Sequence, residues 1–199
     1  MRRKTKAVKV GKITVGGDAP VSIQSMTKTE TWDVPATVKQ IKELVEVGCE
    51  IVRIAVPQEQ DAIALKEIRK QVPNVPLVAD IHFHYKLALM ALEAGIDKLR
   101  INPGNIGNIN RVREVVRACE AQKVPIRIGV NGGSLEKDLL QKYGTATPEA
   151  IVESGMRHVR ILEDLGFTDI IISLKASDVN RMIAAYRLMA TKVDYPFHL

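Results

Sequence analysis

Short β-branched runs alternate with longer amphipathic runs along almost the whole chain, and this alternation constrains the fold more than any other feature. Seven runs predict strands, at Val21–Met26, Glu50–Val56, Leu77–Phe83, Lys98–Asn102, Ile126–Asn131, Asp169–Ala176 and Phe197–Leu199. Between them, apolar residues spaced three to four apart predict helices at Pro35–Val47, Glu59–Gln71, Tyr85–Ala94, Asn110–Gln122, Pro148–Leu165 and Val179–Thr191. Parallel strands need crossover helices, so the alternation predicts a parallel sheet.

An open doubly wound sheet and a closed barrel both satisfy this pattern. The strands recur every 25–30 residues or so, near the one-eighth share of a ~250-residue barrel. No GxGxxG follows the first strand, which weakens the dinucleotide-binding alternative. The sequence therefore favours an α/β fold of the (β/α)8 TIM-barrel type. A short hairpin of Ala7–Val10 and Lys12–Val15 precedes it, and the last residues fall inside the expected seventh strand. We therefore expect residues 1–199 to form an incomplete barrel.

Composition narrows the possible partners. The formal charge of +6 suits an anionic partner, while an aromatic content of only 4% argues against proteins that stack nucleic-acid bases. No run approaches the roughly 20 apolar residues of a membrane span, and no apolar signal-peptide core follows the basic start. Cys49 and Cys119 are far apart and outside any CxxC pattern, as expected of reduced thiols in a cytoplasmic protein without a metal site of its own.

Polar residues share one face of nearly every expected strand, because alternate side chains point the same way. In a barrel the apolar face packs under the helices and this polar face points inward. Four cations would then converge on the interior from different strands, namely Arg53, Arg100, Arg127 and Lys175, with Asp80 as the one clear carboxylate. Unpaired buried charges are costly, and guanidinium groups bind phosphate oxygens in pairs. The imbalance predicts a bound anion of high charge.

Other candidate residues lie near the carboxyl ends of the strands, where barrel active sites are found. Two glycine-rich loops there, 102–108 and 131–134, allow a close approach of the backbone to an anion. The candidate binding residues outside the four cations are Asp80, His82, Asn102, Asn131, Ser134 and Ser173. His82 and His84 lack a third ligand at helical spacing, so we favour hydrogen bonding over metal binding for His82. No residue of the chain is assigned a catalytic role.

Several stretches, in order through the chain, resemble one family. They are Gly16–Pro20 with Ile23–Thr27, Val52–Pro57, Ala79–Phe83, Leu99–Asn105, Ile128–Leu135 and Ser173–Ser177. The chain resembles the N-terminal barrel of the 4-hydroxy-3-methylbut-2-enyl diphosphate synthase family of the non-mevalonate isoprenoid pathway. Lys28 departs from the asparagine expected in many members.

The resemblance implies a TIM barrel that binds 2-C-methyl-D-erythritol 2,4-cyclodiphosphate, an oxidoreductase that opens this ring and removes a hydroxyl, and ferredoxin or flavodoxin as electron donor. It implies substrate contacts at Arg53, His82, Arg100, Arg127, Asn131 and Lys175. It also implies a homodimer with a [4Fe–4S] cluster on a C-terminal domain that this chain lacks, so residues 1–199 alone should be inactive. Two alternatives remain open: an aldolase-type barrel using Lys175 as a Schiff-base lysine, and a non-catalytic anion-binding module.

Overall fold

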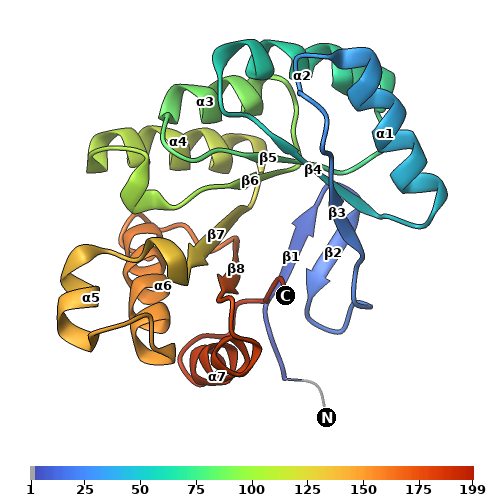
Figure 1. The fold of residues 1–199 in the computed structure, drawn as a ribbon. Helices are drawn as coiled ribbons and strands as arrows, with labels where there is room; N and C mark the ends of the chain where they lie inside the picture. Colours follow the sequence, from blue (N-terminus) through green and yellow to red (C-terminus); the bar gives the residue numbers. More distant parts are fainter. Residues whose placement is uncertain (1–2) are drawn as a thin grey trace.

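Six parallel strands and their crossover helices build the main layer of the computed structural model, which describes residues 3–199 (Figure 1). The strands lie in the order of the chain, as β3 (Gln24–Met26), β4 (Ile51–Ala55), β5 (Leu77–Asp80), β6 (Lys98–Arg100), β7 (Ile126–Asn131) and β8 (Ile170–Lys175). Sequential parallel neighbours are the arrangement of a TIM barrel, and the sheet forms an open half-barrel.

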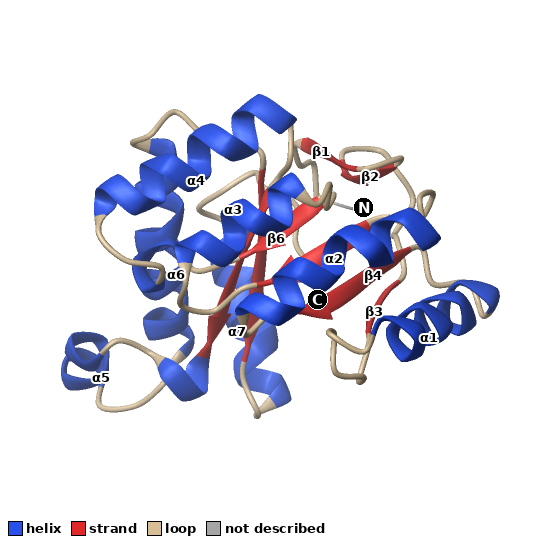
Figure 2. Ribbon diagram, turned by 90° about the horizontal axis from the view of Figure 1, so that it is seen from above, coloured by secondary structure: helices blue, strands red, loops and turns tan. Residues whose placement is uncertain are grey.

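Helices cover the outer side of the curved sheet, and α2 and α3 lie across the strands in the view of Figure 2. They are α1 (Val34–Glu46), α2 (Glu59–Gln71), α3 (Tyr85–Glu93), α4 (Ile109–Gln122), α5 (Lys137–Tyr143), α6 (Pro148–Glu163) and α7 (Val179–Ala190). Side chains cap many of them where they leave the strand ends: Thr147 accepts a hydrogen bond from the Ala150 amide at the start of α6. Gly48, Gly95 and Gly166 have positive φ values after α1, α3 and α6, as is typical of the glycine that ends a helix.

The two faces of the sheet have the polarity that strand alternation predicts. Val52, Ile54 and Val56 are fully buried in the large core beneath the helices. Their neighbours Ile51 and Arg53 point to the other, inner face. The division of the strand side chains into an outer apolar face and an inner mixed face is therefore confirmed.

An antiparallel hairpin of β1 (Ala7–Val10) and β2 (Ile13–Gly16) packs on the inner side of the sheet (Figure 1). Its Val8 and Val10 are buried against Ile51, Val78 and Ile171. These five side chains form a second apolar cluster, which we call the inner plug. It closes the end of the half-barrel at which the strands begin.

Strand boundaries differ from the predicted ones mainly at the strand ends. The first strand is shorter than expected, and Val21 and Ile23 are exposed. The predicted strand Leu77–Phe83 is too long at its carboxyl end: β5 ends at Asp80, and Phe83 is 67% exposed in the following loop. The final residues form only an isolated parallel bridge between Ile172 and Phe197, beside β8.

Two segments between strands and helices contain structure that the sequence pattern did not predict. Single 3-10 turns follow β6 and β7, as η1 (Pro103–Asn105) and η2 (Gly132–Ser134). The helix α5 has only seven residues, too few for a clear apolar period. Among residues 3–199, no helix has the length and hydropathy required to cross a membrane.

Candidate anion-binding site

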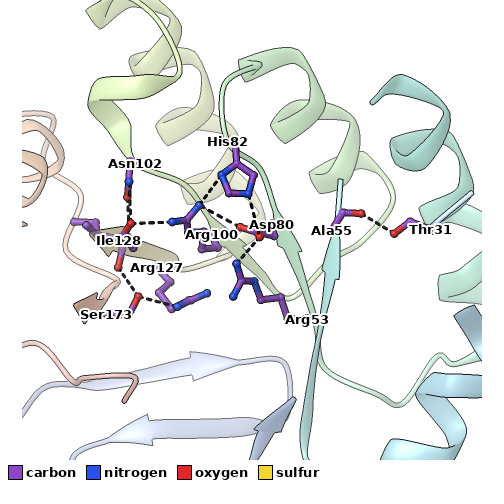
Figure 3. A network of polar contacts seen from close by, with 11 residues as sticks. Thr31, Arg53, Ala55, Asp80, His82, Arg100, Asn102, Arg127, Ile128 and Ser173 are labelled. Atoms are coloured by element: carbon purple, nitrogen blue, oxygen red, sulfur yellow. Dashed lines mark hydrogen bonds and ion pairs between the residues drawn. The ribbon is translucent and has the colours of Figure 1, made fainter. Parts of the chain in front are cut away.

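Asp80 is the centre of a charged group at the carboxyl ends of β4, β5 and β6 (Figure 3). The register places Asp80 beside Ala55 on one side and beside Arg100 on the other. Its carboxylate is almost completely buried, with Oδ2 hydrogen-bonded to Arg53 and Oδ1 3.3 Å from Arg100 Nη1. One carboxylate thus orients two guanidinium groups. We call Arg53, Arg100, Arg127 and Asp80 the arginine cluster.

His82 lies beyond the end of β5 and not on the strand, yet it reaches the arginine cluster. Its Nε2 is 3.3 Å from Asp80 Oδ2, and its Nδ1 is 3.1 Å from Arg100 Nη1. A guanidinium group only donates, so Nδ1 accepts and the ring proton lies on Nε2, facing Asp80. The side chain is half exposed, so His82 can also reorient towards a ligand.

Arg100 and Asn102 both hold the backbone of β7. Arg100 Nη2 and Asn102 Nδ2 each donate to the Gly129 carbonyl over 2.8 Å, and Asn102 Oδ1 accepts from the Gly129 amide over 2.9 Å. A Cβ atom on Gly129 would lie 2.4 Å from Arg100 Nε. The position of the Arg100 guanidinium therefore requires glycine at residue 129, a role that sequence parity alone did not reveal.

Arg127 is the most deeply buried arginine of the cluster, at 3% exposure. Its Nη1 donates to Ser173 Oγ over 2.7 Å, and Ser173 in turn donates to the Ile128 carbonyl. Nε and Nη2 are buried and have no hydrogen-bond partner among residues 3–199. Burial, and then the charges of Arg53 and Arg100, lower the pKa of Arg127 to about 9.

Lys98 is buried as deeply as Arg127, and it was not among the residues that the sequence analysis assigned to the site. It is 1% exposed, and its Nζ donates to Gln24 Oε1 over 2.9 Å. Burial, followed by the charges of Arg127 and Arg53, lowers the pKa of Lys98 to about 7. A cavity of about 550 Å³ is bordered by Lys98, Gln24 and His198. Burial, followed by the charges of Arg127, Lys98 and Arg53, lowers the pKa of His198 to about 3.

Asn131, Ser134 and Lys175 lie on the rim, where β7 and β8 end. Asn131 and Lys175 are partners in the strand register, and both are exposed. Asn131 Oδ1 accepts from the Gly133 amide over 3.1 Å, and Ser134 Oγ donates to the Asn131 carbonyl over 3.4 Å. Within the described chain, no hydrogen bond joins these three residues to the arginine cluster. The exposure of Lys175 provides none of the desolvation that activates a Schiff-base lysine.

The charge balance of this site calls for an anion. The site brings together four cations, Arg53, Arg100, Arg127 and Lys98, and the buried carboxylate of Asp80 pairs with two of them, Arg53 and Arg100. Removing charges from water costs several kcal/mol per ion unless partners compensate for it. Among residues 3–199, Arg53 Nε and Arg127 Nε and Nη2 have no hydrogen-bond partner, which agrees with the charge excess that led us to expect an anionic ligand.

The residues of this chain do not fit an iron–sulfur cluster. Such clusters are held mainly by several thiolates, whereas the chain has two cysteines, both free and buried. Cys49 donates to the Ile51 carbonyl, and burial raises the pKa of the Cys119 thiol to about 12. Over residues 3–199, no group of three or more His, Cys, Asp or Glu side chains is placed to hold a metal ion.

Comparison with known proteins gives a consistent result. The family described as the GcpE TIM-barrel domain matches residues 5–199. The chain is 60% identical over 198 residues to a 4-hydroxy-3-methylbut-2-en-1-yl diphosphate synthase (flavodoxin) of Macrococcus caseolyticus, covering 100% of this chain and 53% of the relative. It is 56% identical over 199 residues to the protein of the same name from Caldanaerobacter subterraneus, covering 56% of that relative. The chain therefore spans about half the length of these relatives.

Solved structures with low sequence identity share the fold. A truncated 3-deoxy-D-arabino-heptulosonate 7-phosphate synthase from Thermotoga maritima superposes with a TM-score of 0.68 at 13% identity, over 98% of this chain and 68% of that one. A dihydropteroate synthase from Xanthomonas albilineans gives a TM-score of 0.64 at 14% identity, over 98% and 76% of the two chains. At these identities the likeness concerns the fold alone.

Proposed function

This chain belongs to the GcpE TIM-barrel family, and from that membership we propose that it is the substrate-binding barrel of an iron–sulfur oxidoreductase of isoprenoid biosynthesis. The proposed enzyme converts 2-C-methyl-D-erythritol 2,4-cyclodiphosphate to 4-hydroxy-3-methylbut-2-enyl diphosphate. It opens the cyclic diphosphate and removes a hydroxyl as water, consuming two electrons and two protons. The relatives are named as flavodoxin-type synthases of this product.

One observation carries the proposal: several buried N–H donors of the arginine cluster have no hydrogen-bond partner among residues 3–199. Arg127 Nε and Nη2 and Arg53 Nε lack partners in the described chain. A cyclic diphosphate offers several charged oxygens in a compact ring, and it would satisfy donors that converge from β4 and β7. A singly charged ligand would leave most of the excess positive charge in place.

The same residues can assist the reaction and not only binding. Opening the ring breaks a C–O bond and leaves more negative charge on the diphosphate. Fixed guanidinium groups in a water-poor site stabilise charge that develops in the transition state. In this proposal Arg53, Arg100 and Arg127 hold the diphosphate, Asp80 keeps Arg53 and Arg100 in place, and the half-exposed His82 reorients to donate a hydrogen bond to the ligand.

The remaining parts of the enzyme are assigned to other segments. Because the two buried cysteines do not fit a cluster, we assign the [4Fe–4S] group and its electron transfer to a further domain of the full-length protein. Residues 1–199 then form the barrel portion, flavodoxin or ferredoxin supplies the electrons, and two full-length subunits form the working dimer. Free thiols such as Cys49 and Cys119 suit a reducing cytoplasm.

The test is a titration of the full-length protein with the cyclic diphosphate, by calorimetry and by turnover with reduced flavodoxin. Arg127→Met keeps the length of the side chain and removes its charge, and we expect it to weaken binding and turnover by about 100-fold or more. Arg160→Met is the matched control, because Arg160 is exposed on α6 at the outer surface.

Each result separates the candidate functions. Tight binding by the wild type that Arg127→Met abolishes and Arg160→Met preserves supports the proposal. Binding without any turnover by the full-length protein would favour the non-catalytic anion-binding module. Equal binding by the wild type and Arg127→Met would overturn the proposed site.

A further inference from the structure

A buried histidine lies behind the site, between the sheet and the helix layer. His158 is on α6 and is 5% exposed. Its Nδ1 is 3.2 Å from the backbone nitrogen of Gly104, which donates to it. Gly104 belongs to η1, the turn that follows β6 and begins directly after Asn102. The ring therefore holds one of the loops that line the candidate site.

The other ring nitrogen of His158 faces a second loop of the site. Its Nε2 is 3.6 Å from Oε1 of Glu136, which lies two residues beyond the end of η2. Ser154, one turn before His158 on α6, donates from Oγ to the same oxygen over 3.1 Å. One helix thus holds the loops after β6 and β7 through a histidine and a carboxylate. We call Gly104, Glu136, Ser154 and His158 the loop tether.

The donor at Gly104 fixes the state of the ring. A backbone N–H can only donate, so Nδ1 of His158 carries no proton, and the proton of the neutral ring lies on Nε2, facing Glu136. Burial lowers the pKa of His158, and the charges of Arg100 and Arg157 lower it further, while Glu136 opposes them. The ring is therefore neutral at physiological pH, as its acceptor role requires.

Glycine at residue 104 lets the loop rest directly on the ring. A Cβ atom there would lie 2.9 Å from Cε1 and 3.3 Å from Nδ1 of His158. A side chain at residue 104 would clash with the ring, so glycine is what permits this close packing of the loop on His158.

Both tethered loops carry residues of the candidate site. Asn102 directly precedes η1 and makes two hydrogen bonds to the backbone of Gly129. Asn131 directly precedes η2, and Ser134 is the last residue of η2. We infer that His158 is a positioning residue, which holds these two loops at the spacing that the anion site needs by accepting a hydrogen bond from the Gly104 amide at Nδ1. This inference rests on the proposed function, because it assigns the loops to substrate binding.

Two amide substitutions in the full-length protein, each reproducing one ring nitrogen, separate the two contacts of the ring. His158→Asn can place an amide oxygen near the position of Nδ1 and keep the acceptor for Gly104. His158→Gln can place its amide near Nε2 and keep the contact with Glu136. We expect His158→Gln to raise the KM for the cyclic diphosphate by about tenfold, since a buried N–H loses its partner. We expect His158→Asn to keep KM within about threefold and kcat to change less than KM in both.

A purely structural histidine would give a different pattern. In that case both variants would lower the thermal midpoint and alter KM to the same extent, and such equality would overturn the inference. The pH dependence of substrate affinity in the wild type is a second readout, because a protonated Nδ1 can no longer accept the hydrogen bond from the Gly104 amide. Substrate affinity should fall as the pH drops through the pKa of His158, which burial places below the ordinary histidine value of 6.5. This fall should be steeper for the wild type than for His158→Asn.

A third measurement does not depend on the substrate. Nitrogen-15 NMR of the ligand-free protein should show the Nε2–H tautomer for His158, and an Nδ1–H tautomer would overturn the inference whatever the enzyme binds. If Arg127→Met binds the cyclic diphosphate normally, the proposed function fails instead. If Arg127→Met loses binding while the two His158 variants behave alike, only the positioning role fails.

Discussion

The inner surface of the half-barrel is apolar where the strands begin and crowded with cations where they end, although the same strands build both regions. On β4, Ile51 belongs to the inner plug and Arg53, two residues later, to the arginine cluster. On β5 the corresponding pair is Val78 and Asp80. Side chains two residues apart on a strand point to the same face, but they lie at different heights along the barrel axis, which we call the lower level (inner plug) and the upper level (arginine cluster). In TIM barrels the end where the strands begin serves stability, and the end where they finish carries the active site. Mutations at the lower level should therefore change stability, and mutations at the upper level should change ligand binding.

The largest expected effect is on stability and belongs to the inner plug. Ile51→Ala should lower the free energy of unfolding of the full-length protein by about 2–5 kcal/mol, because it opens a cavity under the hairpin. The KM for the cyclic diphosphate should stay within about twofold, since Ile51 carries no polar group towards the anion. Chemical denaturation and steady-state kinetics measure the two quantities.

A graded control sharpens this contrast. Ile51→Val removes one carbon and should cost only about 0.5–1.5 kcal/mol of stability. If Ile51→Ala instead raised KM as strongly as Arg127→Met while leaving stability intact, the division of the inner face into a structural level and a binding level would be wrong.

Lys98 breaks the simple division, because it lies at the lower level and is charged. The register pairs it with Val78 of the inner plug, and Arg127 likewise pairs with Ile171. On β6 and β7 the cations therefore reach one step deeper than on β4 and β5. This asymmetry places Lys98 under the arginine cluster, and it makes the protonation of Lys98 depend on what occupies the site.

The next largest expected effect is the uptake of a proton by Lys98 when the anionic substrate binds. The pKa of Lys98 is lowered to about 7 by burial and by Arg127 and Arg53, and a bound polyanion raises it again. Above pH 7, binding should therefore take up as much as about one proton, and affinity should weaken as the pH rises. Calorimetry in buffers of different ionisation enthalpy counts this proton, and Lys98→Met should abolish the uptake.

The sign for the ligand-free protein is the opposite. A lysine whose pKa is lowered in the folded state releases its proton on folding, so the unfolded chain binds more protons between about pH 7 and the ordinary value of 10.5. Lys98 therefore makes the stability of the free protein rise with pH through this window. Stability curves of the wild type and Lys98→Met that run parallel from pH 7 to pH 10 would contradict the buried, deprotonating lysine.

Much of this arrangement follows from the sequence, and the exceptions have physical reasons. Parity along the strands predicted the inner positions of Arg53, Arg100, Arg127 and Ser173, because a backbone period of two is independent of tertiary contacts. The position of His82 was less well predicted. It lies past the last ladder pair of β5, where the alternation in the sequence continues but the strand does not.

Contacts between distant segments were not predictable from one sequence. Lys98 meets Gln24 across the interior, and His158 meets Gly104 from a helix. Neither pair has a local pattern, since the partners are set by the curvature of the sheet and by the docking of α6. For Lys98 the sequence held one indication, because it alternates with Arg100 on the same face of β6. His158 lies on the buried side of the amphipathic helix α6, where the sequence does not indicate which residue a histidine contacts.

The smallest expected effect lies at the boundary between the two levels, at Gly129. Gly129→Ala fits the extended backbone of β7, so stability should change by less than about 1 kcal/mol. The new methyl group would occupy the place of Arg100 Nε, only 2.4 Å away, and the flexible guanidinium must shift from the Gly129 carbonyl and from Asp80. We expect about tenfold weaker binding of the cyclic diphosphate, the loss of one well-placed charged hydrogen bond. Arg100→Met should then be no worse in the Gly129→Ala background than alone, because both substitutions remove the same contact. Additive losses in this double-mutant cycle would show that Gly129 acts on binding by a route other than Arg100.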